Sequence, residues 1–154
     1  MQYGDASMWA DIVKFHKTFN LPQLVVPAVG NDEMMQFREK FLEEELQEFK
    51  DAVMRGDRVK AFDALIDLVY VAMGTAYICN FPWQEGWDIV QTANMRKVRA
   101  EKKEDSTRGT TFDVVKPEGF VPPDKALSAL LDMHEFMSIG GKLPDRDAIR
   151  ERFL

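Results

Sequence analysis

Apolar residues along this chain recur three or four positions apart, as on one face of an α-helix, and almost nowhere alternate as in a β-strand. The spacing predicts a first helix that begins after Asp5 or Ser7 and runs to about Phe19, and a second that is capped by Asn31 or Asp32 and stops near Gly56. Three more helices are predicted at about residues 58–80, 83–103 and 125–137. A last turn or two of helix is expected after the segment IGGKLP. Only TFDVV, in the loop before residue 124, suggests a short strand. The pattern predicts an all-α fold with four core helices.

The length of 154 residues matches that of one folding unit, so we expect a single domain. Its helical, function-bearing part is expected at residues 1–123. Residues 124–154 are expected to form a short C-terminal helical extension of the same domain.

The third predicted helix is apolar on every side except at Asp63 and Asp67. Such a helix belongs in the centre of a bundle or at a subunit interface, so we expect a homodimer or homotetramer. The longest strongly apolar run, Leu68–Cys79, is shorter than the roughly 20 residues that span a bilayer. We therefore expect no membrane segment.

Charge and cysteine content narrow the functional classes. A net charge of −6 argues against binding a nucleic acid polymer, which needs clustered positive charge, but leaves a single nucleotide open as a ligand. The lone Cys79 excludes an intrachain disulfide framework and a multi-cysteine zinc site. The N-terminal residues lack the basic and apolar regions of a signal peptide, so a cytoplasmic protein is expected.

The segment FLEEELQEFKDA carries acids on a helix face that should be buried. At about 100° per residue, the apolar positions of the second helix form one broad arc. Its members are Phe37, Phe41, Leu42, Leu46, Phe49 and Val53. Glu45 and Glu48 fall inside this arc, and Glu44 lies at its edge. Because unpaired buried carboxylates are costly, these positions call for a chemical explanation.

A second acidic pair lies on the third helix, where Asp63 and Asp67 are four residues apart. The short turn at residues 55–57 should make the second and third helices antiparallel, so that Glu45 and Glu48 face these aspartates. Carboxylate oxygens are the ligands that Mg²⁺ or Mn²⁺ prefers, and Mg²⁺ commonly adds substrate phosphates to its shell. The four carboxylates are therefore predicted to bind divalent metal.

The acids also admit simpler interpretations. Acids on helices usually face solvent, which suits Glu43, Asp51 and Glu44. Buried pairing of the four facing acids with Arg38 or another base also remains open. A di-iron carboxylate bundle is excluded, because neither His16 nor His134 has a glutamate three residues before it.

Cations are expected near the acids if the ligand is a polyphosphate. Asn94 and Lys97 lie three apart on the fourth predicted helix, where an amide and an ammonium would face one ligand. Arg108 and Lys116, in a glycine-containing loop, are candidates to close over phosphates. Ordinary solvent-exposed charges are the alternative for all of these cations.

These motifs resemble the MazG-like, all-α nucleoside triphosphate pyrophosphohydrolases, the superfamily that includes phosphoribosyl-ATP pyrophosphohydrolase. The resemblance rests on EELQE and DALIDLVYVAMGTA, with FHKTFNLP, TANMRKV and VVKPEGFVPPD resembling a phage and bacterial branch. The first family motif, Glu-Glu-x-x-Glu, is met in full. The second is commonly Glu-x-x-Asp, but Ala64 stands three before Asp67, with Asp63 four before it.

The resemblance implies Mg²⁺-dependent cleavage of a nucleoside triphosphate to the monophosphate and pyrophosphate, with Mn²⁺ as a substitute and two or more ions per site. Metal would be held by Glu45, Glu48, Asp67 and Asp63, and Glu44 or Glu45 would activate the attacking water. It also implies dimers or tetramers with sites near subunit contacts.

The base of the substrate is not determined by these motifs, although (d)GTP is a candidate from the branch resembled. Candidate base contacts are Phe15, His16, Asn20, Trp83 and Trp87. His16 shares a face with Trp9 and Ile12, so a core histidine is the alternative. A non-catalytic acidic helical protein that binds a partner or a structural ion is the alternative for the whole chain.

Overall fold

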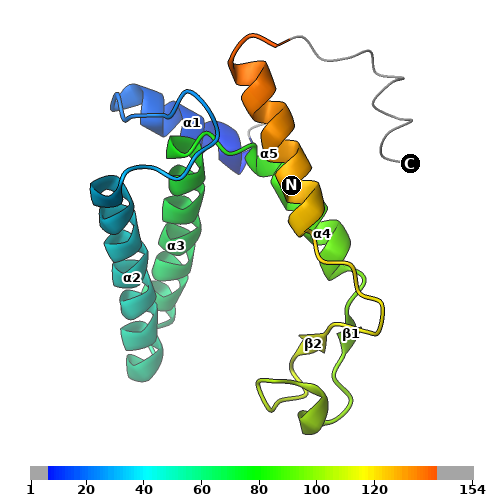
Figure 1. Ribbon diagram of the computed structural model, residues 1–154. Coiled ribbons are helices and arrows are strands. Elements are labelled where there is room, and N and C mark those ends of the chain that lie inside the picture. Colours follow the sequence, from blue (N-terminus) through cyan, green and yellow to red (C-terminus); the bar gives the residue numbers. More distant parts are fainter. Residues whose placement is uncertain (1–6, 142–154) are drawn as a thin grey trace. The chain divides into compact units, whose positions relative to one another are not determined.

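The computed structural model describes residues 7–141 and consists mostly of helices (Figure 1). The elements are α1 (Met8–Thr18), α2 (Asp32–Arg55), α3 (Arg58–Ile78), α4 (Trp83–Asn94), β1 (Val98–Arg99), η1 (Lys103–Asp105), β2 (Val114–Val115) and α5 (Asp124–Ser138). The predicted all-α fold is confirmed. The turn of helix expected after IGGKLP lies outside the described residues.

The described residues form two compact units, one of residues 7–83 with 133–141 and the other of residues 84–132. The expected division of the chain at residue 123 stays a prediction.

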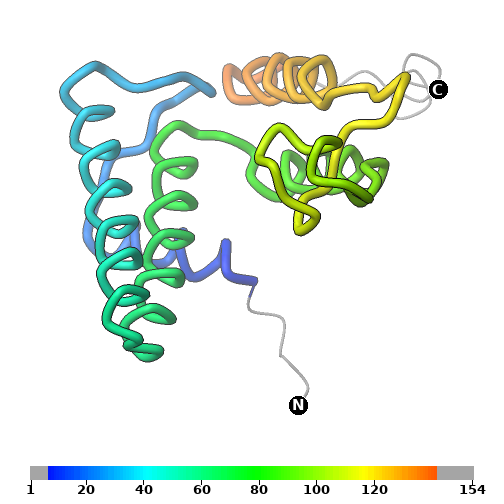
Figure 2. The backbone as a smooth tube through the Cα atoms, turned by 90° about the horizontal axis from the view of Figure 1, so that it is seen from below, coloured from blue at the N-terminus to red at the C-terminus, as the bar shows by residue number. Residues whose placement is uncertain are grey.

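The first unit is built on an antiparallel hairpin of α2 and α3, which lie side by side in Figures 1 and 2. The Asn31 side chain caps α2 by accepting from the Met34 N–H at 2.8 Å. The helix ends at Gly56, whose φ of 66° favours glycine. The Asp57 carboxylate then caps α3 by accepting from the N–H groups of Val59 and Lys60. The short turn between two caps holds the helices antiparallel, as predicted.

The buried core of this unit lies where α1 packs against α3. Ile12, Met73 and Tyr77 form its buried cluster. Trp9 stacks on Trp83 with ring centroids 6.1 Å apart. Among residues 7–141, α3 is the one helix that is long and apolar enough to cross a membrane, but here it is a partly buried helix of the core, packed against α1 and α2.

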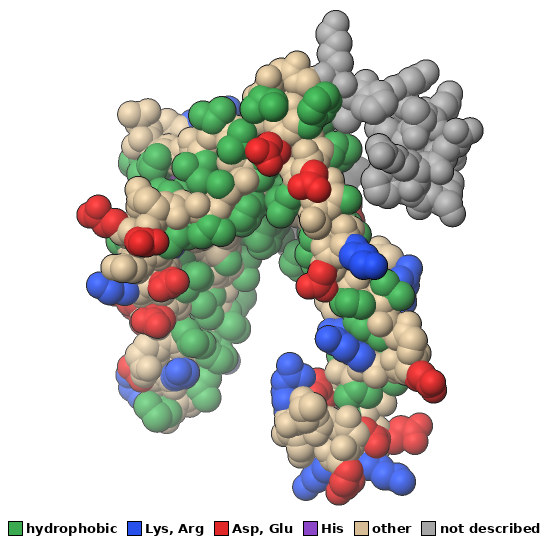
Figure 3. Space-filling model, viewed as in Figure 1, with side chains coloured by type: hydrophobic (Ala, Val, Ile, Leu, Met, Phe, Trp, Pro, Cys, Tyr) green, Lys and Arg blue, Asp and Glu red, His purple; other side chains and the backbone are tan. Residues whose placement is uncertain are grey.

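Large apolar side chains remain exposed along the α2–α3 hairpin, where Figure 3 shows them gathered. Those exposed by 40% or more are Phe37, Leu46, Val53, Met54, Val59, Phe62, Leu65, Ile66 and Val69. The prediction that the whole apolar arc of α2 is buried is therefore wrong for Phe37, Leu46 and Val53 within one chain. The arc is wider than the strip of α2 that α3 covers, so only part of it is removed from solvent.

The second unit corrects one predicted helix. α4 ends at Asn94, not near residue 103, because the chain turns at residues 95–96 and then enters β1. β1 pairs antiparallel with β2, with Val98 opposite Val115 and Arg99 opposite Val114. The strand suggested by TFDVV is thus confirmed. Its partner, Val98–Arg99, lies in a segment that had been predicted to be helical.

Candidate active site

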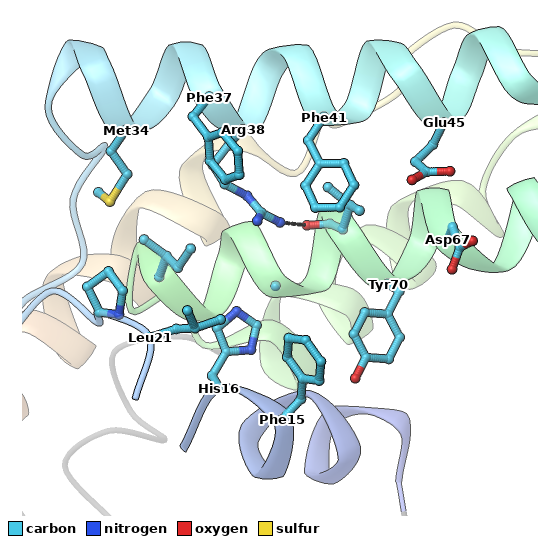
Figure 4. A pocket seen from close by; sticks show the side chains of 14 residues that line it. Phe15, His16, Leu21, Met34, Phe37, Arg38, Phe41, Glu45, Asp67 and Tyr70 are labelled. Carbon is cyan, nitrogen blue, oxygen red and sulfur yellow. Dashed lines mark hydrogen bonds between the residues drawn. The ribbon is translucent and has the colours of Figure 1, made fainter. Parts of the chain in front are cut away.

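Two of the predicted acids meet across the α2–α3 hairpin. Figure 4 shows Glu45 of α2 and Asp67 of α3 close to each other at one end of a pocket. Glu45 is only 8% exposed. Burial raises the pKa of Glu45, and the nearby carboxylates of Asp67, Glu48, Glu44 and Asp63 raise it further. All five predicted acids therefore contribute to one field of crowded negative charge.

The acids differ in burial, in part against expectation. Asp67 is half-buried, whereas Glu44, Glu48 and Asp63 are exposed, so the prediction that Glu48 and Asp63 lie on buried faces is wrong within one chain. α1 contacts α3 at Tyr70 and Tyr77, leaving the earlier turns of α3 uncovered by that helix.

Asp63 has an additional partner in Lys60, whose Nζ lies 3.0 Å from the Asp63 carboxylate. This hydrogen bond and the charge of Asp63 raise the pKa of Lys60. Asp63 is thus the acid of the group that is already partly neutralised by a cation of the chain.

The donor set is compatible with a hard divalent cation, because it consists of carboxylate oxygens only. Over residues 7–141, no three acid, histidine or cysteine side chains are arranged closely enough to hold a metal ion as they stand. The raised pKa of Glu45 reports unfavourable charge that a cation would offset. The residues that fit this task best by position are Glu45 and Asp67, with Glu48 beside them.

A pocket of about 360 Å³ extends from these acids toward α1 (Figure 4). Most of its walls are apolar, including Phe15, Leu21, Met34, Phe37 and Phe41. Its volume lies within the ordinary range of small-molecule sites. The acids thus stand at one end of a cavity that is large enough for part of a ligand.

Arg38 and His16 are the other polar groups of this pocket. The Arg38 Nε donates to Thr75 Oγ1 at 2.9 Å. Its Nη2 donates to the Val71 carbonyl oxygen at 2.7 Å, as the dashed line in Figure 4 marks. Burial lowers the pKa of Arg38. Its guanidinium forms no ion pair with a described residue, so the structure does not support the alternative that Arg38 neutralises the acids.

His16 is buried, as the core interpretation predicted, with 2% of its surface exposed. Its Nδ1 lies 2.9 Å from the Ile12 carbonyl oxygen, whereas Nε2 is buried without a hydrogen-bond partner among the described residues. His16 also lines the pocket, so the core and ligand-binding interpretations are compatible.

Gly74 allows the two polar groups to approach each other. A Cβ built there would lie 2.9 Å from His16 Cε1 and 3.3 Å from Arg38 Nη2. Sequence reasoning missed Arg38 as a pocket residue. Its spacing of seven residues before Glu45, two helical turns on the same face, was the available signal.

The predicted phosphate-binding cations lie in the second unit. Lys97 follows the end of α4, so the prediction that Asn94 and Lys97 share a helix face is wrong; the Lys97 N–H instead donates to the Asn94 carbonyl oxygen at 3.1 Å. Arg108 Nη1 donates to both carboxylate oxygens of Asp113, at 2.9 and 2.8 Å. Lys116 Nζ lies 5.5 Å from the centroid of the Phe120 ring.

Asp113 organises the loop between the two strands. Its carboxylate accepts from Ser106 Oγ at 2.7 Å and from the Val114 N–H at 2.9 Å, besides Arg108. These hydrogen bonds, first that of Ser106 and then that of Arg108, lower the pKa of Asp113. Arg108 therefore has a structural role in its own loop, whatever else it binds.

Comparison with known proteins places residues 12–94 in a family. The sequence model described as Phosphoribosyl-ATP pyrophosphohydrolase matches this range, which is more than half of the chain. The range includes the acids of α2 and α3, and Arg38 and His16. No curated protein matches the chain in sequence.

The crowding of the acids predicts a stability effect in metal-free protein. A glutamate whose pKa is raised on folding destabilises the folded state at pH above that pKa, and the effect vanishes below the usual value near 4.5. Glu45→Gln should therefore raise the melting temperature at pH 7 in the presence of a chelator, with a gain that shrinks as the pH falls to 4. Thermal unfolding followed by circular dichroism measures this. The exposed Glu43→Gln is the control, and an equal gain in both variants would contradict the explanation.

Proposed function

Because the chain belongs to the phosphoribosyl-ATP pyrophosphohydrolase family, whose activity is the pyrophosphohydrolysis of nucleotide triphosphates, we propose a specific reaction for it. The chain hydrolyses a (deoxy)nucleoside triphosphate to the monophosphate and pyrophosphate with the help of Mg²⁺. The observation that carries this proposal is the buried Glu45 facing Asp67 at the end of an apolar pocket. This arrangement combines a place for cations and phosphates with a place for a base.

In the proposed reaction, Glu45, Glu48 and Asp67 would hold one or more divalent cations, with Asp63 as a less available ligand because of Lys60. When bound, such cations offset phosphate charge and favour ionisation of a water. Glu44 or Glu45 orients this water and accepts its proton. The water oxygen forms a bond to the α-phosphorus while the bond from that phosphorus to the bridging oxygen breaks, and pyrophosphate leaves.

Phosphate binding is proposed for the polar residues of the second unit, namely Asn94, Lys97, Arg108 and Lys116. Lys97 is half-buried and forms no ion pair with a described residue, which leaves its ammonium for a ligand. The Asn94 side chain is exposed. Positive charge here would stabilise the leaving pyrophosphate.

The identity of the nucleotide and the location of the protein can also be proposed from the family branch that the chain resembles. The phage and bacterial branch that the chain resembles includes MazZ, a phage enzyme that degrades (d)GTP in a 2-aminoadenine pathway. We therefore propose (d)GTP as the first substrate to test. A cytoplasmic location follows, in the host if the chain is phage-encoded.

Self-association is also proposed. Many large apolar side chains of α2 and α3 are exposed, and a second copy of the chain would cover them by symmetric, self-complementary packing. The acids lie on the same two helices, so such an interface would also change their exposure.

The reaction is tested by incubating the purified protein with each NTP and dNTP in Mg²⁺ or Mn²⁺ and separating the products. Monophosphate and pyrophosphate are expected from at least one substrate. Glu48→Gln should abolish turnover while circular dichroism shows a retained fold, with Glu43→Gln as the matched control. Release of orthophosphate with a diphosphate would reject the mechanism. No turnover of any substrate would favour the non-catalytic binding protein.

Lys97→Ala should lower kcat/KM by about one to several orders of magnitude, because a charged phosphate contact is lost. Its Mn²⁺ affinity should stay nearly unchanged, whereas Glu48→Gln should weaken Mn²⁺ binding. Kinetics and Mn²⁺ titration on both variants measure the difference. The exposed Lys125→Ala is the control for loss of charge. Parent-like kinetics in Lys97→Ala would remove Lys97 from the site.

Light scattering at micromolar concentration should give a mass of at least two chains of 17.7 kDa. Phe62 is 68% exposed on α3, and Phe62→Asp should shift the protein toward a single chain, because a charge would be buried in the interface. Val29→Asp places the same charge on an exposed apolar residue outside the hairpin. A single-chain mass for the parent would contradict the proposal.

A further inference from the structure

The pocket beside the acids contains two buried polar groups that the proposed reaction does not use. Arg38 is 8% exposed and His16 is 2% exposed, and both line a pocket whose walls are mostly apolar apart from the acids at its end. They approach each other across Gly74, where a side chain would collide with them. Resting on the proposed function, we infer that this pocket binds the nucleobase and selects bases that present an oxo group beside a ring N–H.

His16 supplies an acceptor. The Ile12 carbonyl oxygen can only accept, so the Nδ1 that lies 2.9 Å from it carries the proton. In the neutral ring Nε2 then bears a lone pair, and it is buried with no partner among the described residues. A buried polar atom without a partner is costly, so a ligand N–H at this position would be favoured.

Arg38 supplies donors. Its hydrogen bonds to Thr75 Oγ1 and to the Val71 carbonyl oxygen fix the guanidinium in place. Its remaining N–H groups can donate to a ligand, since a guanidinium has five in all. As a buried cation without a carboxylate partner among residues 7–141, it favours an acceptor that carries negative partial charge.

The pocket walls suit a planar base. Phe15 and Phe41 line it from different helices, and aromatic rings stack on bases of any kind. Glu45 and Asp67 line the same cavity, so a base near Arg38 would leave its phosphates toward the acids (Figure 4).

The Arg38 donors and the His16 Nε2 acceptor together determine which hydrogen-bonding edge of a nucleobase fits the pocket. Guanine, hypoxanthine, uracil and thymine carry an oxo oxygen next to a ring N–H, which pair with Arg38 and His16 respectively. Adenine or cytosine in the same orientation would turn amino hydrogens toward the guanidinium and a ring lone pair toward the lone pair of Nε2. Sites that hydrogen-bond a substrate in this way reject mismatched analogues strongly.

Two pairs of substrates test this recognition. dITP and dUTP carry an oxo group beside a ring N–H, whereas dATP and dCTP carry an amino group beside an unprotonated ring nitrogen and are otherwise identical to them. If the pocket accepts purines, kcat/KM should be at least about 100-fold higher for dITP than for dATP; if it accepts pyrimidines, the same difference is expected for dUTP over dCTP. Equal turnover of both members, or a preference for the amino member, would overturn the inference.

Variants separate recognition from structural support. Arg38→Met keeps a long side chain and removes the donors, while the Val71 carbonyl still accepts from Thr75 Oγ1 at 2.8 Å. His16→Phe removes the acceptor at similar size. Both should lower the preference to about tenfold or less, mainly by raising KM for the oxo member. An equal loss for both members would indicate a merely structural role and overturn the inference. His134→Phe, outside the pocket, is the control.

Direct binding keeps the two proposals distinguishable. Calorimetric titration of the parent with dIMP against dAMP, and with dUMP against dCMP, requires neither turnover nor a substitution. Tighter binding of the oxo member together with no hydrolysis of any triphosphate would reject the proposed reaction and retain the base pocket. Hydrolysis of a triphosphate without any difference in binding between the paired monophosphates would retain the proposed reaction and reject the base pocket.

Discussion

The structure depends on one electrostatic conflict, the placement of carboxylates in the interface between two packed helices. Glu45 is buried opposite Asp67, and the charges of three more acids add to the repulsion. A monomeric hairpin gains no stability from such an arrangement, because burial and like charge both disfavour ionised carboxylates. In the proposed function this arrangement is a binding site, where a cation would offset the repulsion between the carboxylates.

The short turn between α2 and α3 keeps the carboxylates of Glu45 and Asp67 opposite each other. Gly56 and Asp57 make a short turn, so α2 and α3 are aligned along their length. α1 then packs across α3 and closes one side of the pocket with Phe15 and His16. Within this cavity the acids Glu45 and Asp67 lie at one end and the buried Arg38 lies farther along α2, so negative and positive charges are separated along the pocket (Figure 4).

The exposed apolar face and the exposed acids have a common physical origin. A pair of helices covers only one strip of each partner, and α1 reaches α3 only around Tyr70 and Tyr77. Large apolar side chains of the hairpin are therefore left exposed, and so are Glu48 and Asp63. Completion of the site and coverage of this face are therefore linked in the proposed assembly.

The sequence by itself determined the main helices, the antiparallel turn and the approach of Glu45 to Asp67, because periodicity, capping residues and short connections act locally. Residue type predicted the stop at Gly56 and narrowed the two N-caps to Asp5 or Ser7 and to Asn31 or Asp32, of which the structure has Ser7 and Asn31. What only the tertiary structure decided is the end of α4 and the surroundings of Arg38. The strand Val98–Arg99 forms through pairing with residues 114–115, beyond a long loop, and this pairing outweighs its local helical pattern. Likewise, Arg38 joins His16 only because Gly74, distant in sequence from both, leaves room between three helices.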